Sequence, residues 1–304
     1  MIPRPKPERF RLRRTMMFMN AQKPGLIKDA YIYGCDSIML DLEDAVAENQ
    51  KDAARFSLYH ALKTIDYGDT EVIVRINGLD TPHWQEDIRV CVAGGADGIR
   101  IAKCESAQDV KTVEAAVEAA EKEFGVEVGR TLLMAALESP KGILNAYEIC
   151  TASDRMFGVA ISGGDFRKCM QTKPQPDGVD MLVARGQMLI AARAAGVQCF
   201  DTVYTNLDDM AGYEAELRQN KAMGFAGKSL INPKQLRLVH ELFAPTEKEI
   251  LQAEKIVRAY REQSAAGVGV FTVDGKMIDI AFIPGAERTL KLARACGLWE
   301  GDLV

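Results

Sequence analysis

Histidine and long hydrophobic runs are scarce in this sequence, and each shortage disfavours a class of protein. Only three histidines occur among the 304 residues, and none ends an expected strand. The scarcity of histidine therefore disfavours a zinc site at a strand end, and no histidine is placed to serve a Ser-His-Asp triad. No apolar run reaches the roughly 18 residues of a transmembrane helix. The basic, proline-rich start has no apolar core, so it does not read as a secretory signal.

Nucleotide-binding motifs and paired cysteines are also missing. No G-x-G-x-x-G follows a strand and no G-x-x-x-x-G-K-[ST] occurs, so a dinucleotide or P-loop function has no support. The seven cysteines include no C-x-x-C pair, which suggests reduced thiols in the cytoplasm. A net charge of -5 gives no support for nucleic-acid binding. We therefore expect a cytoplasmic protein with neither a nucleic-acid nor a membrane partner.

What the sequence does contain is a regular alternation of short apolar runs and amphipathic stretches. The clearest amphipathic stretch is 106–124, where Val110, Val113 and Val117 share one face. Alternating strands and helices imply a parallel sheet, and eight such units fit an α/β protein of the (β/α)8 TIM-barrel type. The expected strands are 15–21, 37–44, 71–78, 98–104, 131–139, 156–165, 199–205 and 228–232.

Three segments are expected along the chain. Residues 1–12 form a loose basic N-terminal arm, and residues 13–244 form the barrel. Residues 245–304 form a C-terminal extension of helix, hairpin and helix. This extension is too small for a core of its own. We therefore expect it to pack on the barrel, or on a neighbouring subunit, and to act as a lid.

Local signals define the parts of the extension. Thr246, with Glu249 three residues later, predicts a capped helix start. Residues 268–282 predict a hairpin whose turn is Asp274-Gly275. A last helix is expected near Pro284.

Polar residues recur where the expected strands end. In "LLMAALESPKGI" (132–143), an apolar run ends on Glu138 and is broken at once by proline and glycine. Catalytic groups of such barrels lie at the carboxyl ends of the strands, so these residues predict one shared polar site. The strand-end candidates are Asp41, Glu43, Asp44, Arg75, Asn77, Lys103, Glu138, Asp165, Asp201 and Asn232.

Two of these candidates suggest a metal. Glu138 and Asp165 end consecutive expected strands, and no histidine lies near them in the sequence. Magnesium accepts a few carboxylate oxygens and completes its coordination with water and substrate. The pair therefore predicts a Mg2+ site.

Several motifs together resemble a known family. They are "RRTMMF" (13–18), "DLEDAV" (41–46), "VRIN" (74–77), "AALESPKGI" (135–143) and "GFAGKSLINPKQ" (224–235). The chain from residue 13 onward resembles the citrate lyase beta-subunit group of the HpcH/HpaI aldolase superfamily, whose close relatives include malyl-CoA and citramalyl-CoA lyases.

The resemblance implies a magnesium-dependent carbon–carbon lyase that cleaves a citryl thioester into oxaloacetate and an acetyl thioester. It implies that the thioester is bound to an acyl carrier, within a citrate lyase complex of acyl-carrier and acyl-transferase subunits. Glu138 and Asp165 carry over as metal ligands, and Arg75 as a substrate-binding and catalytic arginine. One departure is Gly164, which replaces a glutamate of the family motif.

Further residues are assigned as hypotheses. Arg14 and Lys103 are expected to attract the phosphates of the carrier arm, with solvated surface charge as the alternative. Glu43 and Asp44 are grouped with the substrate-binding residues, and either could instead form a salt bridge with Arg75.

Asp279 is the remaining candidate. It is the only acid on the second arm of the expected hairpin, and apolar neighbours predict partial desolvation, which raises a carboxyl pKa towards the range useful for proton transfer. In relatives, the matching aspartate reaches the site of an adjacent subunit. We therefore expect Asp279 to be the catalytic acid/base in a homo-oligomer, a trimer or a multiple of one.

Other functions remain open at this stage. The chain could be a stand-alone citramalyl-CoA or malyl-CoA lyase, which would act on free coenzyme A thioesters without partner subunits. A thioesterase is a further enzyme alternative. A non-catalytic scaffold subunit is the alternative from another class, although Glu138, Asp165 and Arg75 are all present.

Overall fold

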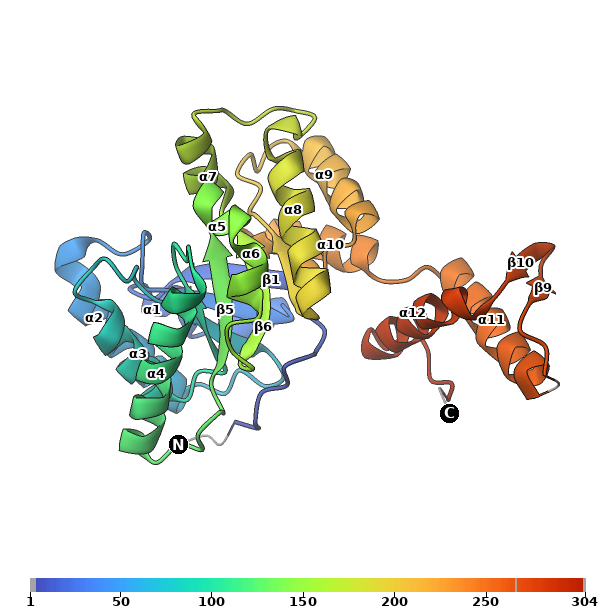
Figure 1. Ribbon diagram of the computed structural model, residues 1–304. Coiled ribbons are helices and arrows are strands. Elements are labelled where there is room, and N and C mark those ends of the chain that lie inside the picture. Colours follow the sequence, from blue (N-terminus) through green and yellow to red (C-terminus); the bar gives the residue numbers. More distant parts are fainter. Residues whose placement is uncertain (1–3, 266, 303–304) are drawn as a thin grey trace. The chain divides into compact units, whose positions relative to one another are not determined.

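The structure is a computed structural model that describes residues 4–265 and 267–302 (Figure 1). These residues form two compact units, the first ending at Val239 and the second beginning at His240. The division falls inside helix α10 (Leu236–Phe243) rather than after residue 244. None of the helices in the described ranges is long and apolar enough to cross a membrane.

The first unit is a closed barrel of eight parallel strands, each paired with its neighbours in chain order. This confirms the predicted (β/α)8 fold. The strands are β1 (Thr15–Asn20), β2 (Ser37–Asp41), β3 (Glu71–Arg75), β4 (Gly98–Ile101), β5 (Leu132–Leu137), β6 (Met156–Ile161), β7 (Gln198–Asp201) and β8 (Gly227–Leu230).

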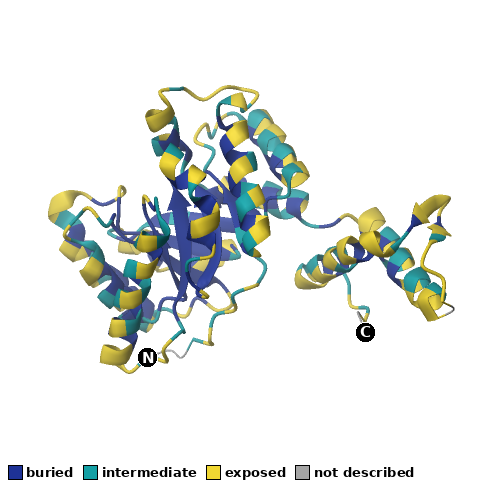
Figure 2. Ribbon diagram, in the orientation of Figure 1, coloured by how far each residue is buried: buried dark blue, intermediate teal, exposed yellow. Residues whose placement is uncertain are grey.

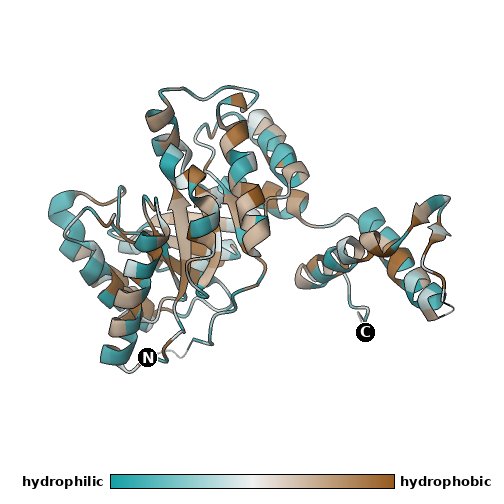
Figure 3. Ribbon diagram, viewed as in Figure 1, coloured by the Kyte–Doolittle hydropathy of each residue, from teal (hydrophilic) through white to brown (hydrophobic). Residues whose placement is uncertain are grey.

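Helices connect the strands around the outside of the barrel. Figure 2 shows the strands buried and the outer faces of the helices exposed, and in Figure 3 the helices alternate between hydrophobic and hydrophilic residues. The connecting helices are α1 (Pro24–Ile27), η1 (Ala30–Tyr33), η2 (Glu48–Gln50), α2 (Lys51–Thr64), α3 (Trp84–Gly94), α4 (Ala107–Phe124), α5 (Pro140–Leu144), α6 (Ala146–Cys150), α7 (Gly163–Met170), α8 (Val179–Ala195), α9 (Met210–Met223) and η3 (Pro233–Gln235).

Several predicted strands extend past their observed ends, among them 37–44, 71–78 and 199–205, and at β6 the difference changes the position of a site residue. The run 156–165 was expected to be a strand throughout, but β6 ends at Ile161 and α7 begins at Gly163. Asp165 therefore lies in the first turn of a helix rather than at a strand end.

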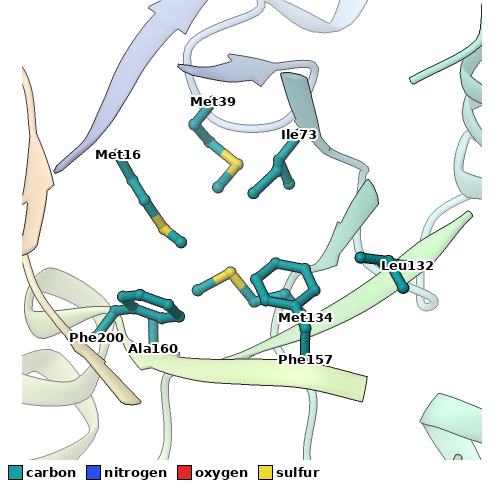
Figure 4. Packing of buried hydrophobic residues seen from close by; sticks show 8 residues of the cluster. All are labelled: Met16, Met39, Ile73, Leu132, Met134, Phe157, Ala160 and Phe200. Atoms are coloured by element: carbon teal, nitrogen blue, oxygen red, sulfur yellow. The ribbon is translucent and has the colours of Figure 1, made fainter. Parts of the chain in front are cut away.

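The middle of the barrel is filled by apolar side chains from alternate strand positions. Met16, Met39 and Ile73 come from three adjacent strands and meet Phe157 and Phe200 from the opposite wall (Figure 4). All five are fully buried. Because side chains alternate between the two faces of a strand, the next inward positions lie one layer above and one layer below this cluster.

The layer below the cluster is polar and fully paired. Arg13, just before β1, donates from Nε and Nη2 to the two carboxylate oxygens of Glu71, both at 2.7 Å. Ser37 donates to the same carboxylate at 2.7 Å. The guanidinium of Arg13 also lies 4.1 Å from the ring centre of Phe157. This ion pair closes the amino-terminal end of the barrel.

The N-terminal arm is bound rather than loose over its described residues. Arg9 donates to the Met156 carbonyl at 2.8 Å, and Arg11 donates to the Asp69 carbonyl at 2.7 Å. Arg4 pairs with Asp97. The basic residues of the arm thus bind polar groups near the amino ends of the strands.

A second buried charge network lies between the barrel wall and its helices. Asp201, at the end of β7, accepts hydrogen bonds from Arg185 on α8 at 2.8 and 2.9 Å and from Lys228 on β8 at 2.7 Å. Glu216 on α9 pairs with the same two cations at 2.7 and 2.6 Å. Although burial opposes ionisation, Lys228 and Arg185 hold the pKa of Asp201 below its usual range. Asp201 thus serves the packing of α8 and α9 and does not face the barrel mouth.

The second unit contains helix α11 (Glu247–Ala265), the antiparallel hairpin β9 (Phe271–Val273) and β10 (Lys276–Ile278), the short helix η4 (Ile280–Phe282) and helix α12 (Ile283–Ala295). Thr246 and Glu249 form the predicted cap, with Glu249 N–H donating to the Thr246 hydroxyl at 3.2 Å. The turn residues Asp274 and Gly275 have φ values of 48° and 77°. Small apolar clusters join α11 to α12 and to the hairpin.

The Asp201 network generates a stability prediction. Asp201→Asn removes one charge of a fully buried group and leaves two cations facing only Glu216, so we expect a loss of about 3–5 kcal/mol in the free energy of unfolding. Glu214→Gln removes the same charge from an exposed pair with Arg218 and should cost less than about 1 kcal/mol. Urea unfolding followed by circular dichroism compares the two. Equal midpoints would show that the network contributes no more than a surface pair.

Candidate active site

Glu138 leaves β5 at the carboxyl end of the barrel, and the next residues explain why the strand stops there. Ser139 begins α5 by accepting a hydrogen bond from Gly142 N–H at 3.2 Å, and Pro140 occupies the first helical turn. A Cβ at Gly142 would lie 2.7 Å from the Cys104 carbonyl oxygen. Strand β5 therefore ends at Leu137 and α5 begins at Pro140. Helix α5 packs so closely against the Cys104 carbonyl that position 142 has no room for a residue larger than glycine.

The carboxyl group of Glu138 is buried and only partly satisfied. Oε1 accepts a hydrogen bond from Ser162 Oγ at 3.2 Å, whereas Oε2 has no hydrogen-bond partner among the described residues. Burial, assisted by the charge of Glu43, raises the pKa of Glu138 to about 7. A buried acid with an unused oxygen is unusual in a folded protein and suggests a group that binds there.

Asp165 lies near Glu138, although it comes from a helix. It is half-buried in the first turn of α7. Gly163, two residues earlier, donates to Thr202 Oγ1 at 2.9 Å, and a Cβ there would lie 2.9 Å from the Arg167 guanidinium. A cavity of about 500 Å3 is lined by both Glu138 and Asp165.

Arg75 is held by two carboxylates at the end of β3. Its Nε and Nη2 donate to Asp41 at 2.7 and 2.6 Å, and its Nη1 lies 2.8 Å from Glu43 Oε2. Although burial opposes the charge, the hydrogen bonds to Asp41 and the nearby acids raise the pKa of Arg75. The alternative of a salt bridge to Glu43 is therefore present, with Asp41 as a further partner.

The other predicted residues of this region divide by position. Lys103, after β4, is half-exposed and pairs with Glu43 at 2.9 Å, while its distance to Asp44 is 4.0 Å. The Asp44 carboxylate is exposed, and it lines a second cavity of about 370 Å3 together with Arg75 and Asp165. Contact between Lys103 and carrier phosphates stays a prediction.

Arg14 is not brought to this site. It directly precedes β1, so it lies at the amino-terminal end of the barrel, opposite to Glu138. Its guanidinium pairs with Asp36 through two bonds of 2.9 Å. The expected contact of Arg14 with the carrier phosphates has no support from this position.

Two further strand-end candidates have structural partners. Asn77 donates to the Leu42 carbonyl at 3.1 Å and to Asp87 at 2.6 Å. Asn232 caps the short helix η3 by accepting from Lys234 N–H at 2.9 Å. Both fix loops around the mouth of the barrel.

Asp279 belongs to the second unit. It follows β10 and caps η4, accepting a hydrogen bond from Ala281 N–H at 2.9 Å. Within its unit it is half-buried, between the buried Ile278 and the exposed Ile280. Its action in a neighbouring subunit stays a prediction.

Sequence reasoning missed Arg100 and Ser162. Arg100 is a fully buried charge on β4, and its Nη2 donates to Ser162 Oγ at 3.0 Å. Both residues line the 370 Å3 cavity. The sequence "GIRIAKC" (98–104) contained a signal for Arg100. A charged side chain inside a strand that is buried on both faces is unfavourable unless it has a binding partner.

The chain is similar to several known proteins. The model of the HpcH/HpaI aldolase/citrate lyase family matches residues 14–233. Citrate lyase subunit beta of Leuconostoc mesenteroides subsp. cremoris is 50% identical over 292 residues, which cover 96% of this chain and 97% of the relative. A (3S)-malyl-CoA thioesterase of Cereibacter sphaeroides is 36% identical, covering 95% of this chain and 97% of that protein.

Solved structures give the same picture. The CitE protein of Mycobacterium tuberculosis, in complex with magnesium, acetoacetate and coenzyme A, has a TM-score of 0.74 and 28% identity. The match covers 93% of this chain and 98% of that one. With a family model that spans most of the barrel and relatives similar over nearly their whole length, this chain belongs to the HpcH/HpaI aldolase/citrate lyase family.

Proposed function

We propose that this protein is a carbon–carbon lyase that cleaves a citryl thioester into oxaloacetate and an acetyl thioester. The observation that carries the proposal is the set of charged residues at the mouth of the barrel. Glu138 and Asp165 line one cavity. Arg75 and Arg100 line a second cavity, which Asp165 also lines. The 50% identity with citrate lyase subunit beta of Leuconostoc mesenteroides supports the choice of substrate.

The residues at the mouth fit a magnesium ion. Glu138 Oε2 is buried without a hydrogen-bond partner among the described residues, and the half-buried Asp165 adds a second carboxylate to the same cavity. Within the described ranges no cluster of three or more metal-ligating side chains occurs, which suits an ion that completes its coordination with water and substrate. Bound there, magnesium would polarise the hydroxyl and carboxylate of the substrate as a Lewis acid.

The reaction needs a base, an acid and a stabiliser of negative charge. The base takes the proton of the substrate hydroxyl, the adjacent carbon–carbon bond breaks, and a ketone forms on the oxaloacetate half. The bonding electrons pass to the acetyl half as a thioester enolate, whose carbon then accepts a proton. Arg75 is fixed by Asp41 and Glu43, so its charge is preorganised for a developing anion.

Asp279 is our candidate for the proton transfers. Its place after β10, at the start of η4, leaves one carboxylate oxygen without a backbone partner among the described residues. We propose that it acts in the site of a neighbouring copy within a homo-oligomer, with the second unit as the lid.

We further propose that the protein works in the cytoplasm as one subunit of a citrate lyase complex and takes its thioester from an acyl-carrier subunit loaded by an acyl-transferase subunit. A second candidate is activity on malyl-CoA or citramalyl-CoA, favoured by the 36% identical (3S)-malyl-CoA thioesterase. Measuring oxaloacetate, glyoxylate and pyruvate release from the three coenzyme A thioesters, with and without magnesium, separates these functions. Release of free coenzyme A with malate or citrate would indicate a thioesterase.

Magnesium binding gives the first prediction for this site. Glu138→Gln and Asp165→Asn each remove a charged ligand, so turnover should fall by more than about 100-fold and the magnesium requirement should rise. Calorimetric titration with magnesium in the presence of oxaloacetate measures the binding directly. Asp154→Asn, an exposed acid before β6 at the opposite end of the barrel, is the control. Near-normal turnover of either variant at low magnesium would exclude the assignment.

The paired position of Arg75 gives a second prediction. Arg75→Lys keeps the charge but loses the planar fork that binds both oxygens of Asp41, so we expect kcat/KM to fall by roughly 10–100-fold. A melting curve shows how much of the loss is structural. Unchanged kcat/KM together with an unchanged melting temperature would argue against both a catalytic and a structural role.

Action across subunits gives a third prediction. Inactive Asp279→Asn subunits are mixed with inactive Asp165→Asn subunits, and partial activity should return because a mixed oligomer can contain one intact site. Mass spectrometry of the intact oligomers verifies that subunits exchange. Exchange without recovered activity would rule out action in trans, and full activity of Asp279→Asn alone would rule out its catalytic role.

A further inference from the structure

Arg100 carries a buried charge that the protein itself leaves mostly unpartnered. Only 1% of the residue is exposed. Its Nη2 donates to Ser162 Oγ at 3.0 Å, while Nε and Nη1 have no hydrogen-bond partner among the described residues. Three nitrogens of a guanidinium usually find partners when they are removed from water. The unused donors therefore indicate a group that is supplied from outside.

The neighbours of Arg100 show why no carboxylate of the chain fills this place. In the register of the barrel, Asp41 is level with Arg75 and Arg75 is level with Arg100. Asp41 turns both oxygens to Arg75. Arg100, one strand further, has no ion pair within the described part of the chain. One row of side chains thus holds a single acid and two cations.

Glu43 does not correct this imbalance. Its two oxygens face Arg75 at 2.8 Å and Lys103 at 2.9 Å. Both guanidiniums of the row lie 5.2 Å from the ring centre of Phe18, which separates them from the apolar layer below. The row is therefore the floor of the 370 Å3 cavity, which Phe18, Arg75 and Arg100 all line.

The electrostatic consequence is a site prepared for an anion. Burial and the positive charge of Arg75 lower the pKa of Arg100 to about 10, so it remains charged at neutral pH. Glu138, Glu43 and Asp41 offset part of this effect through space, but none of them forms an ion pair with Arg100 in the described part of the chain. A carboxylate that reaches the unused donors of this desolvated cation gains a strong, directional interaction.

The proposed substrate offers one anionic group that its near relatives lack. The alcohol carbon of a citryl thioester carries a carboxymethyl group, where a citramalyl thioester has methyl and a malyl thioester has hydrogen. The other groups on that carbon are the same in all three. Selection of the citryl thioester therefore needs a group that recognises this extra carboxylate, and a cation with unused hydrogen-bond donors suits that role.

We propose that Arg100 is this specificity determinant, binding the carboxymethyl carboxylate of the citryl group and of the oxaloacetate product. The inference rests on the proposed lyase function and adds to it the residue that selects the substrate. Arg75, whose three guanidinium nitrogens face Asp41 and Glu43, is less suited than Arg100 to bind this carboxylate.

A competing role runs through Ser162. Arg100 donates to Ser162, and Ser162 donates to Glu138 Oε1 at 3.2 Å. Arg100 could thus act only by positioning Glu138. Positioning would affect every substrate alike, whereas carboxylate binding affects only the substrates that carry the extra carboxylate.

The experiment compares kcat/KM for citryl-CoA and citramalyl-CoA in the wild type, Arg100→Met, Arg100→Lys and Ser162→Ala. Arg100→Met keeps most of the volume and removes the charge. We expect it to lose about 100-fold or more on citryl-CoA and less than about 10-fold on citramalyl-CoA, because a pocket built for a polar group discriminates strongly. Ser162→Ala should lower both activities by the same factor.

Binding provides a readout that does not depend on turnover. Calorimetry with oxaloacetate and with pyruvate, each with magnesium, should show that Arg100→Met weakens oxaloacetate alone. If Arg100→Met does not fold, Arg100→Lys tests the same point, since it keeps the charge but loses the fork and should still weaken oxaloacetate more than pyruvate.

The outcomes separate the two proposals. Equal losses on both substrates and both ligands would overturn the role of Arg100 in specificity while leaving the lyase function intact. A wild-type enzyme, assayed with its subunit partners, that cleaves no citryl thioester would overturn the proposed function. In that case a selective loss of oxaloacetate binding would still support an anion site at Arg100.

Discussion

A closed parallel barrel directs every second side chain of each strand into one crowded interior, and the position of charge in this protein follows from that constraint. The middle layer is apolar, with Met16, Met39 and Ile73 facing Phe157 and Phe200 (Figure 4). Charge can therefore enter the interior only below or above this layer. All strands run in the same direction, so their carboxyl ends meet at one end of the barrel. The layer below closes the amino-terminal end, and the layer above lies next to the βα loops that carry the catalytic residues of such barrels.

The two polar layers differ in how completely they are satisfied. At the amino end, Arg13 and Glu71 form a two-bonded ion pair that Ser37 completes. At the carboxyl end, buried atoms of Glu138 and Arg100 have no hydrogen-bond partner among the described residues. Outside the barrel interior, Arg185 Nη1 and Asn220 Oδ1 also lack a hydrogen-bond partner among the described residues. Incomplete pairing of buried charges lowers stability, so its occurrence in the carboxyl-end layer, next to a complete amino-end layer, suggests that these groups are kept for a ligand.

The sequence was sufficient for the fold because the strands are apolar on both faces and separated by amphipathic helices. Its errors have physical causes. "AISGGD" (160–165) looks like a strand that continues, but Gly163 allows a helix to begin within contact distance of Thr202. Arg14 was expected to attract the carrier phosphates, but a residue before a parallel strand lies at the end of the barrel opposite to Glu138. Arg100 was overlooked because a strand that is apolar on both faces gives no alternation from which to tell that one charged residue points into the barrel.

The acids of the carboxyl end also explain why two arginines can occupy one layer. Asp41 and Glu43 neutralise Arg75, and Glu43 is shared with Lys103. Glu138, whose pKa is raised to about 7 mainly by burial, would be ionised by a cation held next to it. Metal and substrate would then complete opposite parts of one network: the cation compensates Glu138 and Asp165, and an anionic substrate compensates Arg100. On this view neither ligand is accommodated well without the other, so magnesium and a dicarboxylic product should bind cooperatively.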